Sequence, residues 1–320
     1  MPDNGKSRKD IMQYLPEGFL FESEENKSRC ASLSALREAA ASGEILEARA
    51  LVCDSSHNLI LDMGGFKGVI PREECAIGIA EGTVRDIAIL SRVNKPVCFQ
   101  VTGFFTDQRG NQRPLLSRRK AQETCRRQYL DRLTPGDILP ARVTHLEKFG
   151  AFVDIGCGVV SLIPIDAISV SRISHPRDRF TVGQDIFAVV RSVDGGRITL
   201  SHRELLGTWE ENAAFFSPGE TVSGVVRSVE DYGIFVELTP NLAGLAEKRE
   251  GVFPGQQASV YIKSLLPDKM KVKLILIDAF SGDAPPQPLR YFRTQGHLDR
   301  WVYSTAQCGK IIETDFTAQA

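Results

Sequence analysis

The feature that most constrains the fold of this chain is an internal repeat. Residues 135–137 (PGD) are followed by 149–155 (FGAFVDI), and both blocks return 83 residues later as 218–220 (PGE) and 232–238 (YGIFVEL). Two matching blocks at one spacing indicate two copies of a single folding unit.

A fainter copy precedes these two. Residues 68–71 (GVIP) align with 161–164 (SLIP), and 115–119 (LLSRR) resemble 199–203 (TLSHR). The offset differs between these blocks, so the loops differ in length while the order of the elements is kept. The chain is therefore predicted to hold three tandem domains of one kind.

Each copy consists of short runs of alternating or β-branched residues, such as 138–144 and 186–193, which are broken by Gly, Pro and Asp. Short strands at this spacing favour a small β-barrel over a βαβ unit. We predict an all-β chain of three tandem five-stranded barrels joined by short helices. The helices are expected at 121–133 and 203–216, with a further candidate at 32–41.

The region beyond residue 278 is predicted to be a tail. Residues 282–288 hold three prolines and indicate a linker, and 298–303 are predicted to pair with 310–316 as a hairpin. The expected division of the chain is an N-terminal segment 1–42, a degenerate barrel 43–120, a helical connector 121–133, a barrel 134–206, a helical connector 207–215, a barrel 216–278, and the linker and tail 279–320.

The charge balance limits what the chain can bind. It has 39 basic and 40 acidic side chains and a formal net charge of −1. A protein that grips duplex DNA through phosphates usually carries a marked basic excess. Any nucleic-acid binding here is therefore expected to rest on local basic patches and on stacking.

Several other classes of function lack a sequence signal. The seven cysteines include no C-x-x-C pair and the five histidines show no metal-ligand spacing, so no metal site and no cofactor is predicted. No Ser-His-Asp or paired-carboxylate arrangement is apparent, so we predict no catalytic residue and no enzyme. The N-terminus lacks the apolar run of a signal peptide, and no apolar stretch reaches about 18 residues. The expected location is the cytoplasm, without membrane contact.

Alternation along a strand sorts side chains onto two faces. In the second copy it places Ala151, Val153 and Ile155 inside the barrel and Phe152 and Asp154 on its outer, polar face. The third copy repeats the pattern, with Ile234, Val236 and Leu238 inside and Phe235 and Glu237 outside. An aromatic ring on a polar face is costly unless something covers it.

A glycine precedes each of these strands. Gly150 and Gly233 are predicted to form a bend or bulge that brings Phe149 and Tyr232 onto the outer face. Two rings on one face suit the stacking of single-stranded bases, at about 1–3 kcal/mol per base. The alternative is that the rings pack against a connector helix or a neighbouring barrel.

Basic residues lie near the predicted aromatic face. In the second copy Arg197 follows the turn at 194–196, with Arg191 and Arg203 close in sequence. In the third copy lysines alternate along the last strand: Lys269, Lys271 and Lys273. These side chains are candidate partners for phosphates, whereas a lone cation in such a place is usually solvated surface charge.

Together these motifs resemble the RNA-binding domain of ribosomal protein S1. The resemblance lies in PGD-x5-V from residue 135, FGAFV from residue 149 and GRI-x-LS-x-R from residue 196, followed by the junction SHRELLGTW from residue 201. The second copy matches throughout, the third matches well and the first only weakly. The resemblance covers about two-thirds of the chain.

The resemblance implies an OB-type barrel that binds single-stranded RNA on one face. By position, the implied RNA-binding residues are Phe149, Phe152, Asp194, Arg197 and Arg203 in the second copy, and Tyr232, Phe235, Lys271 and Lys273 in the third.

The sequence also departs from the family pattern. Pro164 and Glu247 stand where the family often has a histidine, and the turn at 194–197 is one residue shorter than a common form. In the first copy His57 and Ile60 occupy the aromatic positions, so that barrel is not expected to stack bases.

Two functions follow as hypotheses. In the first, the chain binds single-stranded RNA, specifically mRNA, and acts in translation. In the second, the barrels are protein-docking modules, with residues 1–120 contacting the small ribosomal subunit or another RNA machine. An accessory role in RNA decay is the weaker third reading. The aromatic and basic residues 299–303 of the tail are expected to pin it to the third barrel rather than to bind RNA.

Overall fold

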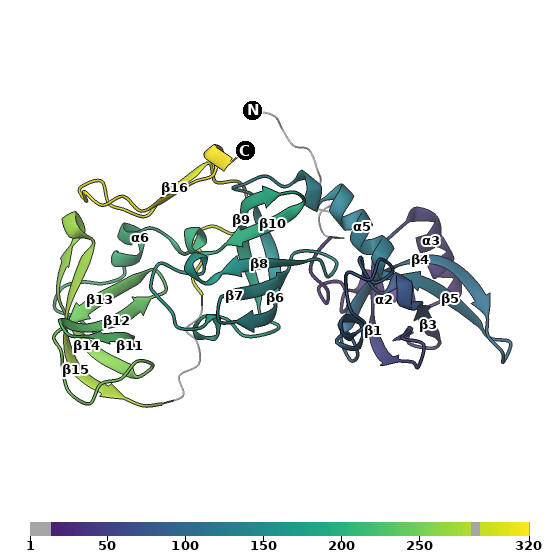
Figure 1. Cartoon of the computed structure of the whole chain (residues 1–320), viewed down its shortest axis with the longest axis horizontal. Helices are drawn as coiled ribbons and strands as arrows, with labels where there is room; N and C mark the ends of the chain where they lie inside the picture. The colour runs from purple at the N-terminus through teal and green to yellow at the C-terminus, as the bar shows by residue number, and fades with distance from the viewer. Residues whose placement is uncertain (1–13, 283–288, 320) are drawn as a thin grey trace. The chain divides into compact units, whose positions relative to one another are not determined.

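The computed structural model describes residues 14–282 and 289–319 (Figure 1), so the predicted linker at 282–288 lies outside the described residues except for its first. They form two compact units, one of residues up to 133 together with 154–160, the other of 134–153 and 161 onward. None of the described helices is long and apolar enough to cross a membrane.

The prediction of three five-stranded barrels is confirmed. Each is closed, and in each the third strand pairs in parallel with the fifth. The strands of barrel 1 are β1 (Leu46–Cys53), β2 (Leu59–Asp62), β3 (Lys67–Ile70), β4 (Pro96–Thr106) and β5 (Gln112–Ser117). Those of barrel 2 are β6 (Ile138–Glu147), β7 (Gly150–Asp154), β8 (Val160–Pro164), β9 (Asp185–Asp194) and β10 (Arg197–Ser201). Those of barrel 3 are β11 (Thr221–Glu230), β12 (Gly233–Thr239), β13 (Leu242–Ala246), β14 (Gln257–Leu266) and β15 (Lys271–Phe280).

Among the residues from 14 onward that the structure describes, two helices precede the first strand of barrel 1. The expected helix at 32–41 is α3 (Leu33–Ser42), which begins after a Ser32 cap and ends where Gly43 adopts a left-handed conformation. Helix α2 (Glu24–Cys30) was not predicted, because its seven residues are polar except Cys30 and so carry no apolar periodicity. The remaining short helical segments of this barrel are α4 (Ile87–Leu90) and the 3-10 turn η1 (Arg72–Glu74).

The connector after barrel 1 is helical. Helix α5 (Arg118–Gln128) begins three residues before the predicted start, because the Ser117 side chain accepts a hydrogen bond from Lys120 N and caps it. A 3-10 turn, η2 (Leu130–Arg132), completes the connector.

The prediction of one continuous helix over 203–216 is wrong. A 3-10 turn, η5 (Arg203–Leu206), is separated from α6 (Trp209–Ala213) by Gly207, which has φ +83°. A Cβ atom at Gly207 would lie 2.6 Å from the Phe292 ring. The backbone therefore turns here to let the C-terminal segment pass.

The interior of each barrel follows the predicted alternation. Ala151, Val153, Ile234 and Val236 are fully buried. Asp154, however, does not lie on a solvated face as predicted, since only 3% of it is exposed. Its carboxylate accepts hydrogen bonds from the backbone N–H groups of Glu17, Gly156 and Gly158, all within the first unit.

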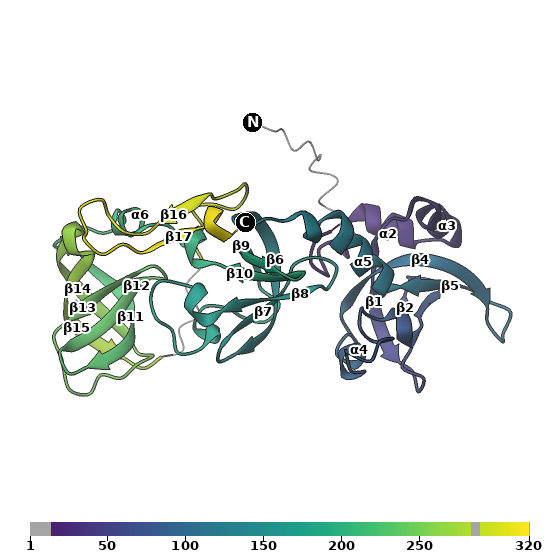
Figure 2. The same ribbon diagram turned by 45° about the horizontal axis from the view of Figure 1, so that its top comes forward.

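The tail forms the predicted hairpin. Strand β16 (Arg300–Val302) pairs antiparallel with β17 (Glu313–Asp315), and Figure 2 shows this hairpin beside α6. Trp301 and Tyr303 join the core of barrel 3, as expected for a pinned tail. Leu298 and Phe316 pack instead on Val189 and Leu205 of barrel 2, so the tail contacts both barrels.

A fully buried histidine beneath the tail makes the stability depend on pH. His202 Nδ1 lies 2.8 Å from Ile168 O and its Nε2 lies 3.0 Å from the Tyr291 hydroxyl. Burial lowers the pKa of His202 to about 4, from an ordinary value of 6.5. Below pH 6.5 the imidazole of His202 is protonated in the unfolded chain, whereas in the folded chain it stays neutral until about pH 4.

We therefore expect the free energy of unfolding to fall by about 2–3 kcal/mol between pH 6.5 and pH 4 on account of His202. Urea unfolding at several pH values measures this. His202→Gln should flatten the profile in that window, whereas His145→Gln, at an exposed position, should leave it unchanged. Equal slopes in wild type and His202→Gln would contradict the assignment.

Candidate nucleic-acid interface

An aromatic pair stands on the outer face of barrel 3. Tyr232 immediately precedes β12 and is 70% exposed, and Phe235 lies half-buried within that strand. Their ring centroids are 6.0 Å apart in an edge-to-face arrangement. Phe235 pairs with Leu245 of β13, which pairs with Lys273 of β15, so one row across three strands carries a ring, an aliphatic side chain and a cation.

The glycine before Phe235 is required by packing. Gly233 has φ +152°, and a Cβ atom there would lie 2.5 Å from Ala246 O and 2.9 Å from Leu245 Cδ1. The predicted bulge is found instead in the partner strand β11, where the register shifts between Val226 and Ser228. Gly150 of barrel 2 has the same role, because its Cβ would lie 2.5 Å from Ile163 O.

The row borders a basic groove of about 840 Å³. All four residues predicted for this barrel line it: Tyr232, Phe235, Lys271 and Lys273. Sequence reasoning missed three further cations in the lining, namely Lys248, Arg249 and Lys263. Only one acidic side chain, Glu247, lines the groove with them. A chain with a net charge of −1 therefore concentrates positive charge on this face.

Barrel 2 presents a similar pair. Phe149 is 56% exposed, and its ring meets that of Phe152 edge-to-face at 5.9 Å. The exposed imidazole of His145, from β6, stacks on Phe152 at 6.2 Å. His145 was not predicted, because in the alternation of β6 it has the parity of the buried residues Leu139, Ala141 and Val143, although its own side chain is exposed.

The predicted turn residues of barrel 2 lie opposite each other. Arg197 pairs with Asp194 across β9 and β10, and both are exposed. Arg197 lies two residues before Thr199, which pairs with Leu162 of β8, so it belongs to the same face of β10 as Thr199. The charge of Arg197 is thus faced by that of Asp194 across the strand pair.

Arg203 does not join this face. Its guanidinium donates to Glu204 Oε1 at 3.2 Å and to Thr314 Oγ1 at 3.2 Å, and it lies over the Trp301 ring at 5.9 Å. The structure therefore places this predicted phosphate ligand against the tail.

The matching row of barrel 1 is aliphatic. Ile60 pairs with Val69, and Val69 pairs with Leu115, at the positions that hold Phe235, Leu245 and Lys273 in barrel 3. His57 lies in the turn before β2, with its Nδ1 4.0 Å from Asp86 Oδ2. This row offers no ring on which a base could stack.

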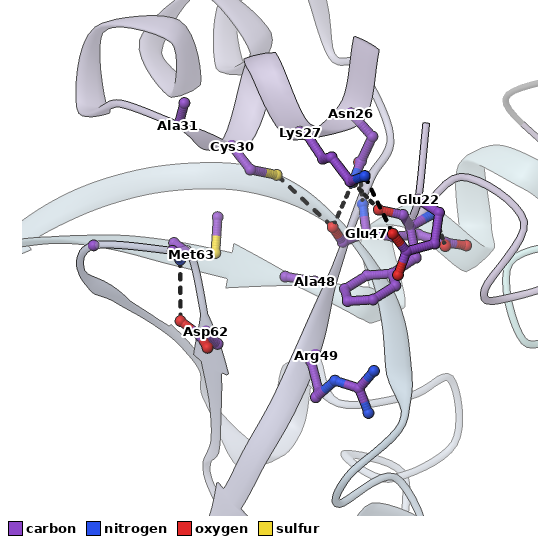
Figure 3. Close-up of a pocket in the computed structure, with 13 residues that line it drawn as sticks. Glu22, Asn26, Lys27, Cys30, Ala31, Glu47, Ala48, Arg49, Asp62 and Met63 are labelled. Atoms are coloured by element: carbon purple, nitrogen blue, oxygen red, sulfur yellow. Dashed lines mark hydrogen bonds and ion pairs between the residues drawn. The ribbon is translucent and has the colours of Figure 1, made fainter. Parts of the chain in front are cut away.

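A separate hollow of about 430 Å³ in the first unit is lined by α2 and β1 (Figure 3). Its floor holds the buried carboxylate of Glu47, whose pKa burial raises to about 8. That carboxylate accepts hydrogen bonds from Gly18 N and Phe21 N at 2.8–2.9 Å. Glu47 is thereby engaged in fixing the N-terminal segment to the barrel.

Comparison with known protein families gives a match in barrel 2. Residues 132–203 match the family model of the S1 RNA binding domain. Small ribosomal subunit protein bS1 of Leuconostoc lactis is 34% identical over 194 residues, which is 58% of this chain and 43% of that protein. The bS1 protein of Staphylococcus aureus (strain COL) is 29% identical over 261 residues, 76% of this chain and 64% of that protein. The resemblance to the S1 family is thus confirmed, and the matched region spans about two-fifths to two-thirds of these relatives.

Proposed function

We propose that this chain, as a relative of ribosomal protein S1, binds single-stranded RNA through the outer faces of barrels 2 and 3. The observation that carries the proposal is the groove on barrel 3, where the exposed Tyr232 and the half-buried Phe235 stand among five cations. Bases can reach such rings only when they are not paired and stacked within a duplex, so single strands fit this face and duplexes do not.

The residues proposed to contact RNA are Phe149, Phe152, Asp194 and Arg197 on barrel 2, and Tyr232, Phe235, Lys271 and Lys273 on barrel 3. Stacking accepts every base, so we expect weak sequence preference. Two linked faces raise the overall affinity through effective concentration. Because its relatives are named as small ribosomal subunit proteins, we propose mRNA as the RNA and translation in the cytoplasm as the process.

The cations of the groove give the first test. Replacing Lys271 and Lys273 together by glutamine should weaken RNA binding and flatten its dependence on salt. Each phosphate contact to a single strand contributes about −0.7 to the slope of log K against log salt, so the slope should become shallower by about 1.4. Fluorescence anisotropy of a labelled unstructured RNA across a salt series measures both effects.

The matched control replaces two exposed lysines outside the groove, Lys67 and Lys310, by glutamine. That variant should retain the wild-type slope. The proposal for barrel 3 fails if both double variants show the same slope.

A second candidate function is docking on the small ribosomal subunit through residues 1–120. The aliphatic row of Ile60, Val69 and Leu115 favours it, because that face lacks the rings and the cation of barrel 3. RNA contact would then be incidental to docking.

A further inference from the structure

The long loop of barrel 2 between β8 and β9 docks on barrel 3. Arg179 donates two hydrogen bonds to the Glu237 carboxylate, at 2.7 and 2.8 Å, and both side chains are 5% exposed. Just beyond the C-terminal end of β12, three residues after Glu237, Ser171 N donates to Pro240 O at 3.1 Å. The predicted outward residue Glu237 is therefore buried, because a segment of the preceding barrel covers it.

This docking brings the loop to the edge of the aromatic face. Glu237 lies two residues after Phe235 in β12, on the same side of the strand, so their Cα atoms are roughly 7 Å apart. Arg227, the bulged residue of β11, also binds the Glu237 carboxylate, at 2.9 and 3.0 Å. One residue of barrel 2 and one of barrel 3 thus clamp the same carboxylate next to the stacking ring.

The charges within this contact cancel. Burial would raise the pKa of Glu237, but the hydrogen bonds and charges of Arg179 and Arg227 outweigh it and hold the pKa below its usual range. Asp178 lies 3.8 Å from Arg227, so two carboxylates face two guanidinium groups. The neighbouring Arg177 is exposed, and the part of the chain that the structure describes contains no ion-pair partner for it.

The backbone of Arg177 is fixed. It lies in the 3-10 turn Pro176–Asp178, where His175 Nδ1 accepts its N–H at 3.1 Å. The next two residues, Asp178 and Arg179, both contact barrel 3. The backbone of Arg177 is therefore fixed next to the contact with barrel 3, although the residue belongs to barrel 2 by sequence.

We propose that Arg177 completes the RNA-binding face of barrel 3 by contacting a phosphate of the strand that stacks on Tyr232 and Phe235. This inference rests on the proposed function of that face. The site is composite, since barrel 3 supplies the rings and the loop of barrel 2 supplies the arginine.

A double-mutant cycle tests the proposal in the full chain, with a labelled oligouridine as probe. Arg177→Gln should weaken binding about fivefold, as expected for the loss of one solvent-exposed charged contact. The loss should shrink in a Phe235→Ala background, because the strand no longer lies on barrel 3, and should persist in full in a Phe152→Ala background.

Arg172 provides the matched control on the same loop. Arg172 is exposed. It directly follows Ser171, which binds Pro240 just beyond the end of β12 that lies farther from Phe235. Arg172→Gln should leave the affinity within about twofold of wild type, and thermal melting should show both variants folded.

The proposal is overturned if the Arg177→Gln loss is absent, equals that of Arg172→Gln, or couples to Phe152 rather than to Phe235. Those results leave RNA binding by the wild type intact. A wild-type chain that does not bind oligouridine at all would instead overturn the proposed function, and this inference with it.

Discussion

Replacing Phe152 and Phe235 together by alanine is expected to weaken binding of single-stranded RNA at least about 30-fold, since each stacked base contributes about 1–3 kcal/mol. Both rings are half-buried on outer faces and each meets a more exposed neighbour, Phe149 or Tyr232, edge-to-face. Their removal therefore takes away the platform for bases while the barrel interiors stay intact. Anisotropy of a labelled unstructured RNA measures the loss.

Ile60→Ala is the matched control, because it truncates the same outward position of barrel 1, and it should leave the affinity unchanged. Unaltered RNA binding by the double alanine variant would refute stacking. Co-sedimentation with small ribosomal subunits separates the two functions. Retention of the double alanine variant on the subunits would favour docking through residues 1–120, and its loss would favour RNA contact.

Glu237→Gln is expected to destabilise the chain by about 3–5 kcal/mol. The substitution leaves the guanidinium groups of Arg179 and Arg227 facing each other with no carboxylate between them, and Arg179 is almost fully buried. Removing one partner of a buried ion pair costs this much because the remaining charge stays desolvated. Urea unfolding at pH 7 measures the difference.

The pH dependence of this loss follows from the lowered pKa of Glu237. A carboxylate with a depressed pKa contributes stability that is fully present above its ordinary value of 4.5 and is lost as the pH falls further. The difference between wild type and Glu237→Gln should therefore be constant near neutrality and shrink in acid.

Asp185→Asn is the control for charge removal as such. It breaks the exposed pair with Arg142, whose atoms lie 2.6 Å apart, and should cost less than about 1 kcal/mol. Equal losses for Asp185→Asn and Glu237→Gln would contradict the account of the buried contact.

The barrels and the aromatic face of barrel 3 could be predicted from sequence because both depend on local sequence pattern. The repeat at one spacing gave two domains, the fainter first copy gave the third, and alternation along each strand separated Phe235 from Val236. The same alternation, with β15 as the neighbour of β13, brings Lys273 into the row of Phe235. None of this requires knowledge of contacts between domains.

The errors arise where distant segments meet. Alternation gives the face of Glu237 and Asp154, but it cannot tell whether another segment covers that face. Arg179 lies 58 residues before Glu237, and nothing in the spacing signals the contact. Arg203 was misassigned for the same reason, since the tail that holds it lies about 110 residues further along the chain.

The helix predicted over 203–216 failed for a different reason. The predicted helix runs through Gly207, whose positive φ ends the first turn and leaves room for the Phe292 ring. A glycine inside a helical pattern can be tolerated or can end the helix. The sequence alone does not show which, because it does not show whether another segment packs against that glycine.

The central claim, that barrels 2 and 3 bind single strands by stacking, is tested most directly by anisotropy titrations of a labelled unstructured RNA and of duplex DNA of equal length, across a salt series. The account predicts micromolar or tighter RNA binding with a shallow salt slope and little binding of the duplex. An absence of RNA binding at low salt, or equal affinity for both probes, would contradict it.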